Sequence, residues 1–266
     1  MLSGWWRALG ARREQAALKR RAIPDDLWKR TLVRYPFLQR SSVEAAQELR
    51  RLTSLFLDSK EFSTTGGLRL TDAMAVAIAA QACLPVLRLG LARYQHFVGI
   101  VVHPDVVMAP RSLQDPDGVV HEYTDMLAGE VMDGGPVMLS WPDVRRSGHS
   151  AQQGYNVVIH EFAHVLDMAC GHADGMPQLP ADLPARDWRT TLQAAFTQLE
   201  HDLAEGRTTL LDPYGTTGPE EFFAVASETF FVNAGQMKKE HPALYRMLSR
   251  CYLQDPAADL PALRRG

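Results

Sequence analysis

The residues of this chain whose types and spacing best suit chemistry are His160, Glu161 and His164, an H-E-x-x-H pattern inside the apolar run 157–167. On a helix, residues four apart lie above one another on one face, so both imidazoles can bind one metal ion. Glu161 then lies close enough to hold a metal-bound water and take its proton. Two histidines, a third protein ligand and an open position are what a hydrolytic zinc site requires. The pattern therefore favours a zinc hydrolase over a helix with two core histidines.

The residues that follow His164 do not suit a metzincin. Asp167 replaces the glycine of the longer metzincin pattern, and Cys170 stands where its third histidine would be. Asp167 lies on the same helical face as His164. We therefore expect Asp167 either to accept a hydrogen bond from a ligand histidine or to pair with a basic side chain.

The third ligand is expected in the segment 219–232, which reads as a largely apolar helix beginning at Pro219. Glu221 and Glu228 are seven residues apart, so they share one face of that helix. A carboxylate is costly to bury unless it is paired or binds a metal. One glutamate is therefore expected as the ligand and the other as a hydrogen-bond partner of the site, and the spacing alone does not choose between them.

Motifs spread over most of the chain from about residue 80 to 255 are similar to those of one known family. They occupy residues 83–87, 89–91, 120–121, 136–141, 159–167 and 214–231. The chain resembles the Mlc titration factor A family of bacterial zinc metallopeptidases. Its catalytic part is also similar to the metalloprotease domain of anthrax lethal factor, in which a tyrosine is followed seven residues later by Glu-Phe-Phe-Ala.

The resemblance implies roles for particular residues. It places the third ligand of one zinc ion at Glu221 and makes Tyr214 a hydrogen-bond donor to the developing oxyanion, where the alternative is an ordinary loop tyrosine. Glu161 would serve as general base for the zinc-bound water and then pass the proton to the leaving amine. The resemblance also suggests that His121 can approach the metal as a fourth ligand in a resting state, which would have to open for catalysis. The alternative for His121 is a histidine in a surface loop.

The function implied by the resemblance is that of an aminopeptidase-like zinc peptidase acting on small or unstructured peptides. It also implies a role in regulating sugar phosphotransferase expression through a Mlc-type transcription repressor. The residues themselves do not separate exo- from endopeptidase cleavage. One alternative is a regulatory binding protein that sequesters the repressor with little or no turnover, and another is a structural zinc protein with a closed four-ligand site.

Composition excludes several other classes of protein. The net charge of −3 and the pI near 6.3 give no electrostatic footprint for direct binding of nucleic acid. No apolar run approaches the roughly 18–20 residues of a membrane span. The first 21 residues place their basic residues after the apolar ones, which is the reverse of a signal peptide. Cys83, Cys170 and Cys251 are widely spaced and indicate buried thiols in a reducing compartment, so we expect a cytoplasmic protein.

A chain of 266 residues with 46% hydrophobic content can bury a full core. We expect an α+β, mostly helical, zincin-like (gluzincin) metallopeptidase fold with one small mixed sheet. The active site should lie between the sheet edge and two helices. Residues 1–40 are expected to form a helical or mobile extension, and residues 41–266 a single metallopeptidase domain.

The expected elements follow from periodicity and turn signals. Helices are predicted over 25–35, 41–58, 71–83, 157–167, 187–204, 219–232 and 241–253, and strands over 97–103, 106–109, 119–124, 129–132 and 136–141. The strand 106–109 is expected to extend the sheet of 97–103. The strand 136–141 is expected either at the sheet edge, where a peptide can add by main-chain hydrogen bonds, or in the core. Residues 171–184 read as a surface loop and residues 256–266 as a frayed end.

Overall fold

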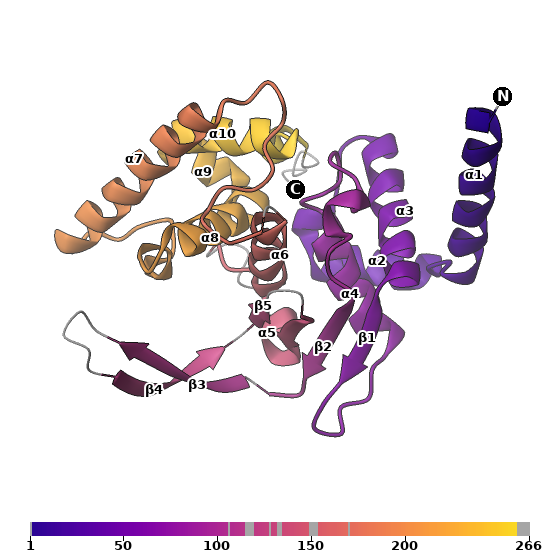
Figure 1. Cartoon of the computed structure of the whole chain (residues 1–266), viewed down its shortest axis with the longest axis horizontal. Helices are drawn as coiled ribbons and strands as arrows, with labels where there is room; N and C mark the ends of the chain where they lie inside the picture. Colours follow the sequence, from indigo (N-terminus) through magenta and orange to yellow (C-terminus); the bar gives the residue numbers. More distant parts are fainter. Residues whose placement is uncertain are drawn as a thin grey trace, which may run out of the picture.

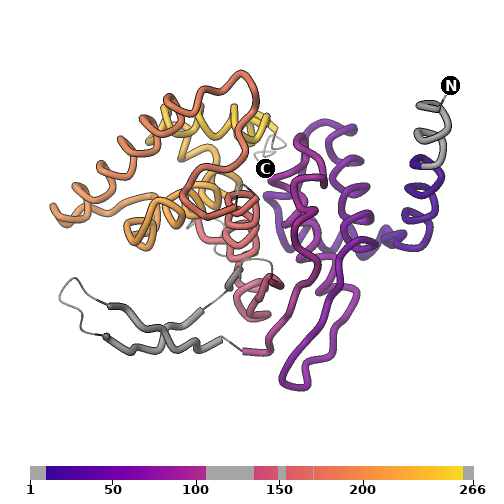
Figure 2. Tube along the Cα trace, in the orientation of Figure 1, coloured from indigo at the N-terminus to yellow at the C-terminus, as the bar shows by residue number. Residues whose placement is uncertain are grey.

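The computed structural model describes residues 2–105, 107–114, 120–127, 129–131, 135–148, 154–169 and 171–259, and it describes only the backbone of residues 2–9 and 107–131. The chain passes from a group of N-terminal helices through a small sheet to the helix that carries the H-E-x-x-H pattern, and then into a second group of helices (Figure 2). This α+β, mostly helical architecture confirms the predicted fold class.

The described residues of the N-terminal half form the helices α1 (Leu2–Arg20), α2 (Asp25–Arg34), α3 (Val43–Ser59) and α4 (Asp72–Cys83), with the short 3-10 helix η1 (Pro36–Leu38) before α3. Two of these helices begin at capped residues, because Ser42 caps α3 and Thr71 caps α4 through their side-chain oxygens. Helix α1 packs on α3, where Arg20 pairs with Asp58 at 2.8 Å. The division of the chain at residue 40 stays a prediction.

The main sheet has four strands in the order β1 (Glu61–Thr64), β2 (Gly99–His103), β6 (Val137–Ser140) and β5 (Gly129–Val131). The first three are parallel and β5 runs antiparallel to β6, so the sheet is mixed, as predicted. The interpretation of 136–141 as an edge strand is wrong, since β6 lies between β2 and β5. A strand's letters do not reveal which of its two sides another strand will cover.

Strands β3 (Val107–Gln114) and β4 (Val120–Leu127) form a separate two-stranded antiparallel sheet. The prediction that 106–109 extends the sheet of β2 is therefore wrong for the described residues 107–109. Val107 pairs with Leu127 of β4 instead of with a residue of β2. The local pattern identifies a strand here, but pairing depends on which partner the chain brings alongside.

Helix α6 (Val157–Met168) lies at the centre of the molecule, between the N-terminal helices and the C-terminal group (Figure 1). The remaining elements are η2 (Leu91–Tyr94), α5 (Trp141–Arg146), α7 (Ala185–Ala204), η4 (Pro213–Thr216), α8 (Pro219–Val232), α9 (Ala234–Glu240), α10 (Pro242–Tyr252) and α11 (Pro256–Asp259). The prediction of a frayed end is wrong for residues 256–259. There the Ala257 N–H donates to the Tyr245 hydroxyl at 2.9 Å and ties α11 to α10.

A buried aromatic cluster fixes α6 from the side opposite its histidines. The ring of Phe162 lies 5.7 Å from that of Phe56, 5.1 Å from Tyr94 and 5.5 Å from Phe97, between ring centroids. Phe162 is two residues from both His160 and His164, so its side chain leaves the helix on the other face. Apolar packing on one face thus sets the direction in which the histidines point.

In the part of the chain that is described, no helix has both the length and the apolar character to cross a bilayer.

Candidate metal centre

The two histidines project from one face of α6, as their spacing predicts. Asn156 caps this helix, because its Oδ1 accepts a 2.9 Å hydrogen bond from the Ile159 N–H. The Nε2 atoms of His160 and His164 lie 3.2 Å apart. Both side chains are about nine-tenths buried, so the two nitrogens face a largely enclosed point beside the helix.

Helix α8 packs against α6 and brings a carboxylate to the same point. Glu221 Oε2 lies 3.0 Å from His160 Nε2 and 3.3 Å from His164 Nε2. Within the described chain, His160, His164 and Glu221 form a group that could hold one metal ion, and each offers one of these three atoms as a ligand. Zinc–nitrogen bonds of 2.0–2.1 Å in a tetrahedron separate neighbouring ligand atoms by about 3.3 Å. The observed triangle of 3.0, 3.2 and 3.3 Å therefore matches one face of a tetrahedral zinc site.

The electrostatics of this triangle call for a positive charge at its centre. Burial opposes a charged imidazole, but hydrogen bonds with Glu221 and Glu228 carry the pKa of His160 well above its ordinary value. Burial likewise opposes a charged carboxylate, but hydrogen bonds with His160 and His164 hold the pKa of Glu221 well below its usual range. Either a proton or a metal cation can supply the charge, and two imidazoles with one carboxylate are a donor set that suits zinc.

Glu228 lies two turns beyond Glu221 on α8 and contacts the other side of the same imidazole. Its Oε1 is 2.7 Å from His160 Nδ1, and its Oε2 accepts a hydrogen bond from the Asn156 backbone N–H. When His160 Nδ1 carries the proton of this bond, the Nε2 lone pair faces Glu221 and His164. The geometry thus distinguishes the two glutamates that spacing left equivalent. Glu221 approaches the Nε2 atoms of both histidines, whereas Glu228 holds His160 through Nδ1.

Glu161 and Tyr214 stand beside the metal group. Glu161 is 4% exposed on α6, and burial raises the pKa of its carboxyl to about 7. Tyr214 belongs to η4, which packs against α8, and the residue is 43% exposed. The centroid of the Tyr214 ring lies 6.1 Å from that of His160. A buried acid and a partly exposed tyrosine therefore lie near the candidate ligands, and their catalytic roles stay predictions.

Asp167 has a different partner from either one expected. Its Oδ2 accepts a 2.7 Å hydrogen bond from the Gly175 N–H, while Oδ1 has no hydrogen-bond partner among the described residues. The interpretation of Asp167 as a partner of a ligand histidine or a basic side chain is therefore wrong for the part of the chain described. The loop folds back onto the end of α6 and supplies a backbone donor that the sequence does not reveal. Burial raises the pKa of Asp167 to about 6.

His121 cannot be placed relative to the metal group. Its backbone belongs to β4 and pairs with Leu113, but its side chain lies outside the described residues. The fourth-ligand role of His121 therefore stays a prediction. Cys170 also lies outside the described residues, and Cys83 and Cys251 are free, buried thiols, as expected.

Sequence reasoning missed two residues behind the metal group. Asn156 Nδ2 donates a 2.9 Å hydrogen bond to Oε1 of Gln81, which is fully buried on α4. An asparagine directly before an apolar helix is a cap signal, so Asn156 could have been found. Gln81 is the one polar side chain in the stretch 73–83, and a buried amide must find partners. Nothing in the letters says that these two residues meet.

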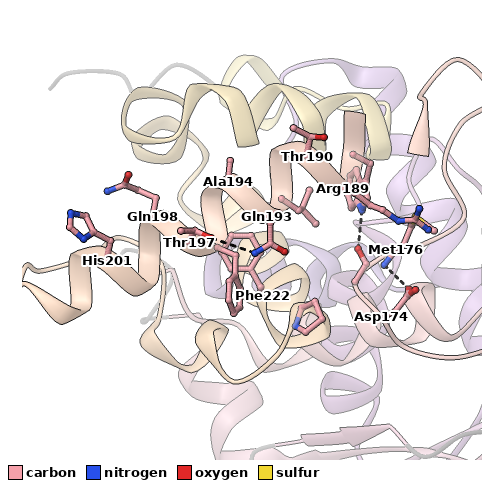
Figure 3. A pocket seen from close by; sticks show the side chains of 15 residues that line it. Asp174, Met176, Arg189, Thr190, Gln193, Ala194, Thr197, Gln198, His201 and Phe222 are labelled. Atoms are coloured by element: carbon pink, nitrogen blue, oxygen red, sulfur yellow. Dashed lines mark hydrogen bonds between the residues drawn. The ribbon is translucent and has the colours of Figure 1, made fainter. Parts of the chain in front are cut away.

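A separate cavity of about 1000 Å³ lies between α7, the 174–176 loop and the first turn of α8 (Figure 3). Trp188, Phe196 and Phe222 supply aromatic walls, and the Trp188 indole N–H donates to the Gly175 carbonyl at 2.9 Å. The residues that line this cavity do not include the three candidate ligands. The cavity is therefore lined by other residues than the metal centre.

Two imidazoles and a carboxylate, held by two packed helices beside a buried glutamate, are the side chains that a metallopeptidase site requires. The chain belongs to the glucose-regulated metallo-peptidase M90 family, whose family model matches residues 9–253. It is similar to proteins called Mlc titration factor A. That of Pectobacterium atrosepticum is 36% identical over 229 residues, 85% of either chain, and that of Cronobacter sakazakii is 34% identical over 247 residues, 90% of this chain and 92% of that protein. An uncharacterised protein of Synechocystis is 37% identical over 225 residues, 84% of this chain and 82% of that protein. The family resemblance of the sequence motifs is thus confirmed.

Proposed function

We propose that this metallopeptidase-family chain binds one zinc ion and hydrolyses peptide bonds. The observation that carries the proposal is the triangle of His160 Nε2, His164 Nε2 and Glu221 Oε2, whose separations of 3.0–3.3 Å suit three ligands of one tetrahedral ion. Zinc at this point would polarise a scissile carbonyl and lower the pKa of a bound water to about 7.

The chain's own residues then have distinct tasks. Glu161 accepts the proton of the attacking water and delivers it to the leaving amine. Tyr214 is partly exposed near His160 and donates its hydroxyl hydrogen to the oxyanion. Glu228 holds the His160 ring in the orientation that ligation needs. Water is kept from the rear of the site by the buried residues of α6 and α8.

The finer features are also part of this proposal. The substrate is a small or unstructured peptide, and cleavage is aminopeptidase-like, as the resemblance implies. The protein acts in the cytoplasm, which the three cysteines favour. His121 would serve as the fourth ligand of a resting state, as the resemblance suggests, and would have to leave that position for catalysis.

The test compares wild type with Glu161→Gln and Tyr214→Phe, using zinc content and the hydrolysis of amino-acid anilides and short peptides. We expect about one zinc per chain in all three proteins. Turnover should be lost in Glu161→Gln and fall about 10²–10³-fold in Tyr214→Phe. Glu220→Gln, a half-buried change on the same helix as Glu221 and outside the candidate ligand group, is the matched control and should keep full activity. Zinc binding by wild type without cleavage of any peptide would refute the peptidase proposal.

His121→Ala separates a resting-state ligand from a structural one. Unchanged or raised peptidase activity with zinc retained is expected for a displaceable ligand. Loss of zinc from this variant would instead indicate a closed structural site. Zinc content before and after dialysis against a weak chelator is the measurement.

A second candidate function is the binding of a Mlc-type transcription repressor. It is favoured by the name Mlc titration factor A, which relatives at 34–36% identity bear. The two functions can coexist, with the repressor as partner and not as substrate. Binding of a purified Mlc-type repressor to wild type and to Glu161→Gln tests this by titration calorimetry. If the repressor binds both proteins with equal affinity and neither protein shows peptidase activity, the binding function is favoured over the peptidase function.

A further inference from the structure

A continuous line of buried hydrogen bonds joins α4 to the imidazole of His160. Gln81 Nε2 donates to the Ala77 carbonyl at 3.0 Å, and Gln81 Oε1 accepts from Asn156 Nδ2 at 2.9 Å. The Asn156 backbone N–H donates to Glu228 Oε2, and Glu228 Oε1 meets His160 Nδ1 at 2.7 Å. Gln81, Asn156 and Glu228 are each at most 3% exposed.

The direction of every bond in this line is dictated by backbone groups. The Ala77 carbonyl can only accept, so the Gln81 amide nitrogen must face it and the amide oxygen must face Asn156. The Ile159 N–H can only donate, so Asn156 Oδ1 must face the helix and Nδ2 must face Gln81. Neither amide can therefore rotate by 180° without placing like groups against each other.

The line ends on the proton of His160. The Asn156 N–H can only donate, so Oε2 of Glu228 must accept from it. Oε1 of Glu228 then faces His160 Nδ1, and when Nδ1 carries the proton of this bond, Nε2 is left free to ligate. Hydrogen bonds thus lead from the Ala77 carbonyl on α4 to Nδ1 of His160 on α6, the atom whose proton defines the tautomer of that histidine.

We propose that Gln81 and Asn156 are positioning residues of the metal centre, which hold Glu228 and so keep His160 with its proton on Nδ1 and Nε2 toward the metal. This inference rests on the metal centre of the proposed function. It assigns the single buried amide of α4 a task in metal binding, in addition to its contribution to packing. Asn156 has two tasks, since it caps α6 through Oδ1 and connects Gln81 to Glu228 through its two N–H groups.

The test uses Gln81→Met and Asn156→Ser. Methionine has nearly the size of glutamine but no donor or acceptor for Asn156. Serine keeps a good helix cap and removes Nδ2. The matched control is Gln254→Met, because Gln254 is also buried and its amide donates to the Leu84 carbonyl at 2.9 Å, just beyond the end of α4.

Two measurements are made on each protein. Competition with a chromogenic chelator gives the zinc dissociation constant. Nuclear magnetic resonance gives the hydrogen-exchange rate of the His160 Nδ1 proton, with EDTA and with saturating zinc. We expect Gln81→Met and Asn156→Ser to raise the dissociation constant about 10-fold and to speed exchange of the proton. The double variant should bind zinc no more weakly than either single variant, because each single variant already removes the same hydrogen bond between Asn156 and Gln81.

The inference is overturned if both single variants bind zinc within twofold of wild type and protect the proton equally well. It is also overturned if Gln254→Met weakens zinc binding as much as Gln81→Met, since general loosening of α4 would then explain the effect. Should Gln81→Met not fold, Asn156→Ser decides the matter alone. A wild type that binds no zinc would refute the proposed function, while the proton exchange in EDTA would still test the line of hydrogen bonds. A wild type that binds zinc but cleaves nothing refutes only the peptidase activity.

Discussion

Replacing Glu228 with glutamine tests how the metal centre controls the state of His160. Two donors face this side chain, His160 Nδ1–H and the Asn156 backbone N–H. A carboxylate can accept from both, but a glutamine has one acceptor oxygen and one amide that donates. Glu228→Gln can therefore satisfy only one of its two neighbours.

The size of the effect follows from the choice that the glutamine must make. With its oxygen toward Asn156, its amide faces Nδ1, so the proton of His160 moves to Nε2 and blocks ligation. Zinc can then bind only after the new glutamine side chain rotates so that its amide faces Asn156. That rotation places two buried donors, the glutamine amide and the Asn156 backbone N–H, against each other. A buried unpaired donor costs about 1–3 kcal/mol, and each 1.4 kcal/mol is a factor of ten. The zinc dissociation constant should rise about 5- to 150-fold.

The assay is chelator competition for zinc, followed by thermal unfolding in EDTA. The control is Glu220→Gln, which removes one negative charge from the first turn of α8 beside Glu221. The control should change the zinc dissociation constant by less than a factor of about two, as expected for a half-buried carboxylate that is not a candidate ligand. If Glu228→Gln also binds zinc within twofold of wild type, the argument that Glu228 sets the tautomer of His160 is refuted.

Three further predictions concern the scaffold around the site. Gly175→Ala should destabilise the fold by about 2–4 kcal/mol in urea unfolding, because Gly175 has φ +76° and an added Cβ would lie 2.5 Å from the Pro219 carbonyl oxygen. The control Gly206→Ala, at φ +69° with open space around the added Cβ, should destabilise it by only about 1–2 kcal/mol. Equal losses in the two variants would contradict the close contact at Gly175. Asp167 has its pKa raised from 3.8 to about 6 by burial, so its contribution to stability is complete below pH 3.8 and is lost as the pH rises through 6. Asp167→Asn should remove this dependence and stabilise the fold at pH 8 by up to about 3 kcal/mol, and parallel pH profiles of the two proteins would contradict it. Phe162→Ala should cost about 3–5 kcal/mol by calorimetry, and a loss below 1 kcal/mol would mean that the aromatic cluster does not anchor α6.

The local features of the site were readable from the sequence because they depend on short spacings. The i, i+4 spacing of His160 and His164 places them on one face of any helix, and α6 confirms that helix. Pro219 starts α8 and Glu221 and Glu228 share its inner face, as predicted. Helix caps at Ser42 and Thr71 follow from equally local chemistry.

Pairing between strands was not readable in the same way. The short strand β1, Glu61–Thr64, has one large apolar residue and no alternation that would distinguish it from a loop. It forms because β2 lies alongside and supplies parallel hydrogen bonds. The position of β5 outside β6 likewise depends on how the chain returns to the sheet, which no local pattern records.

The sequence by itself determined the types of the candidate ligands and the helices that carry them, because both follow from side-chain chemistry and the helical repeat. Only the tertiary structure decided which glutamate faces Nε2 of His160 and which faces Nδ1, since that depends on how α8 is set against α6. It also decided that Asp167 binds the loop at Gly175 and that Gln81 of α4 meets Asn156. Those contacts join residues that are distant in the chain or separated by an irregular loop. Their distances are fixed by the packing of the whole core and not by any spacing along the sequence.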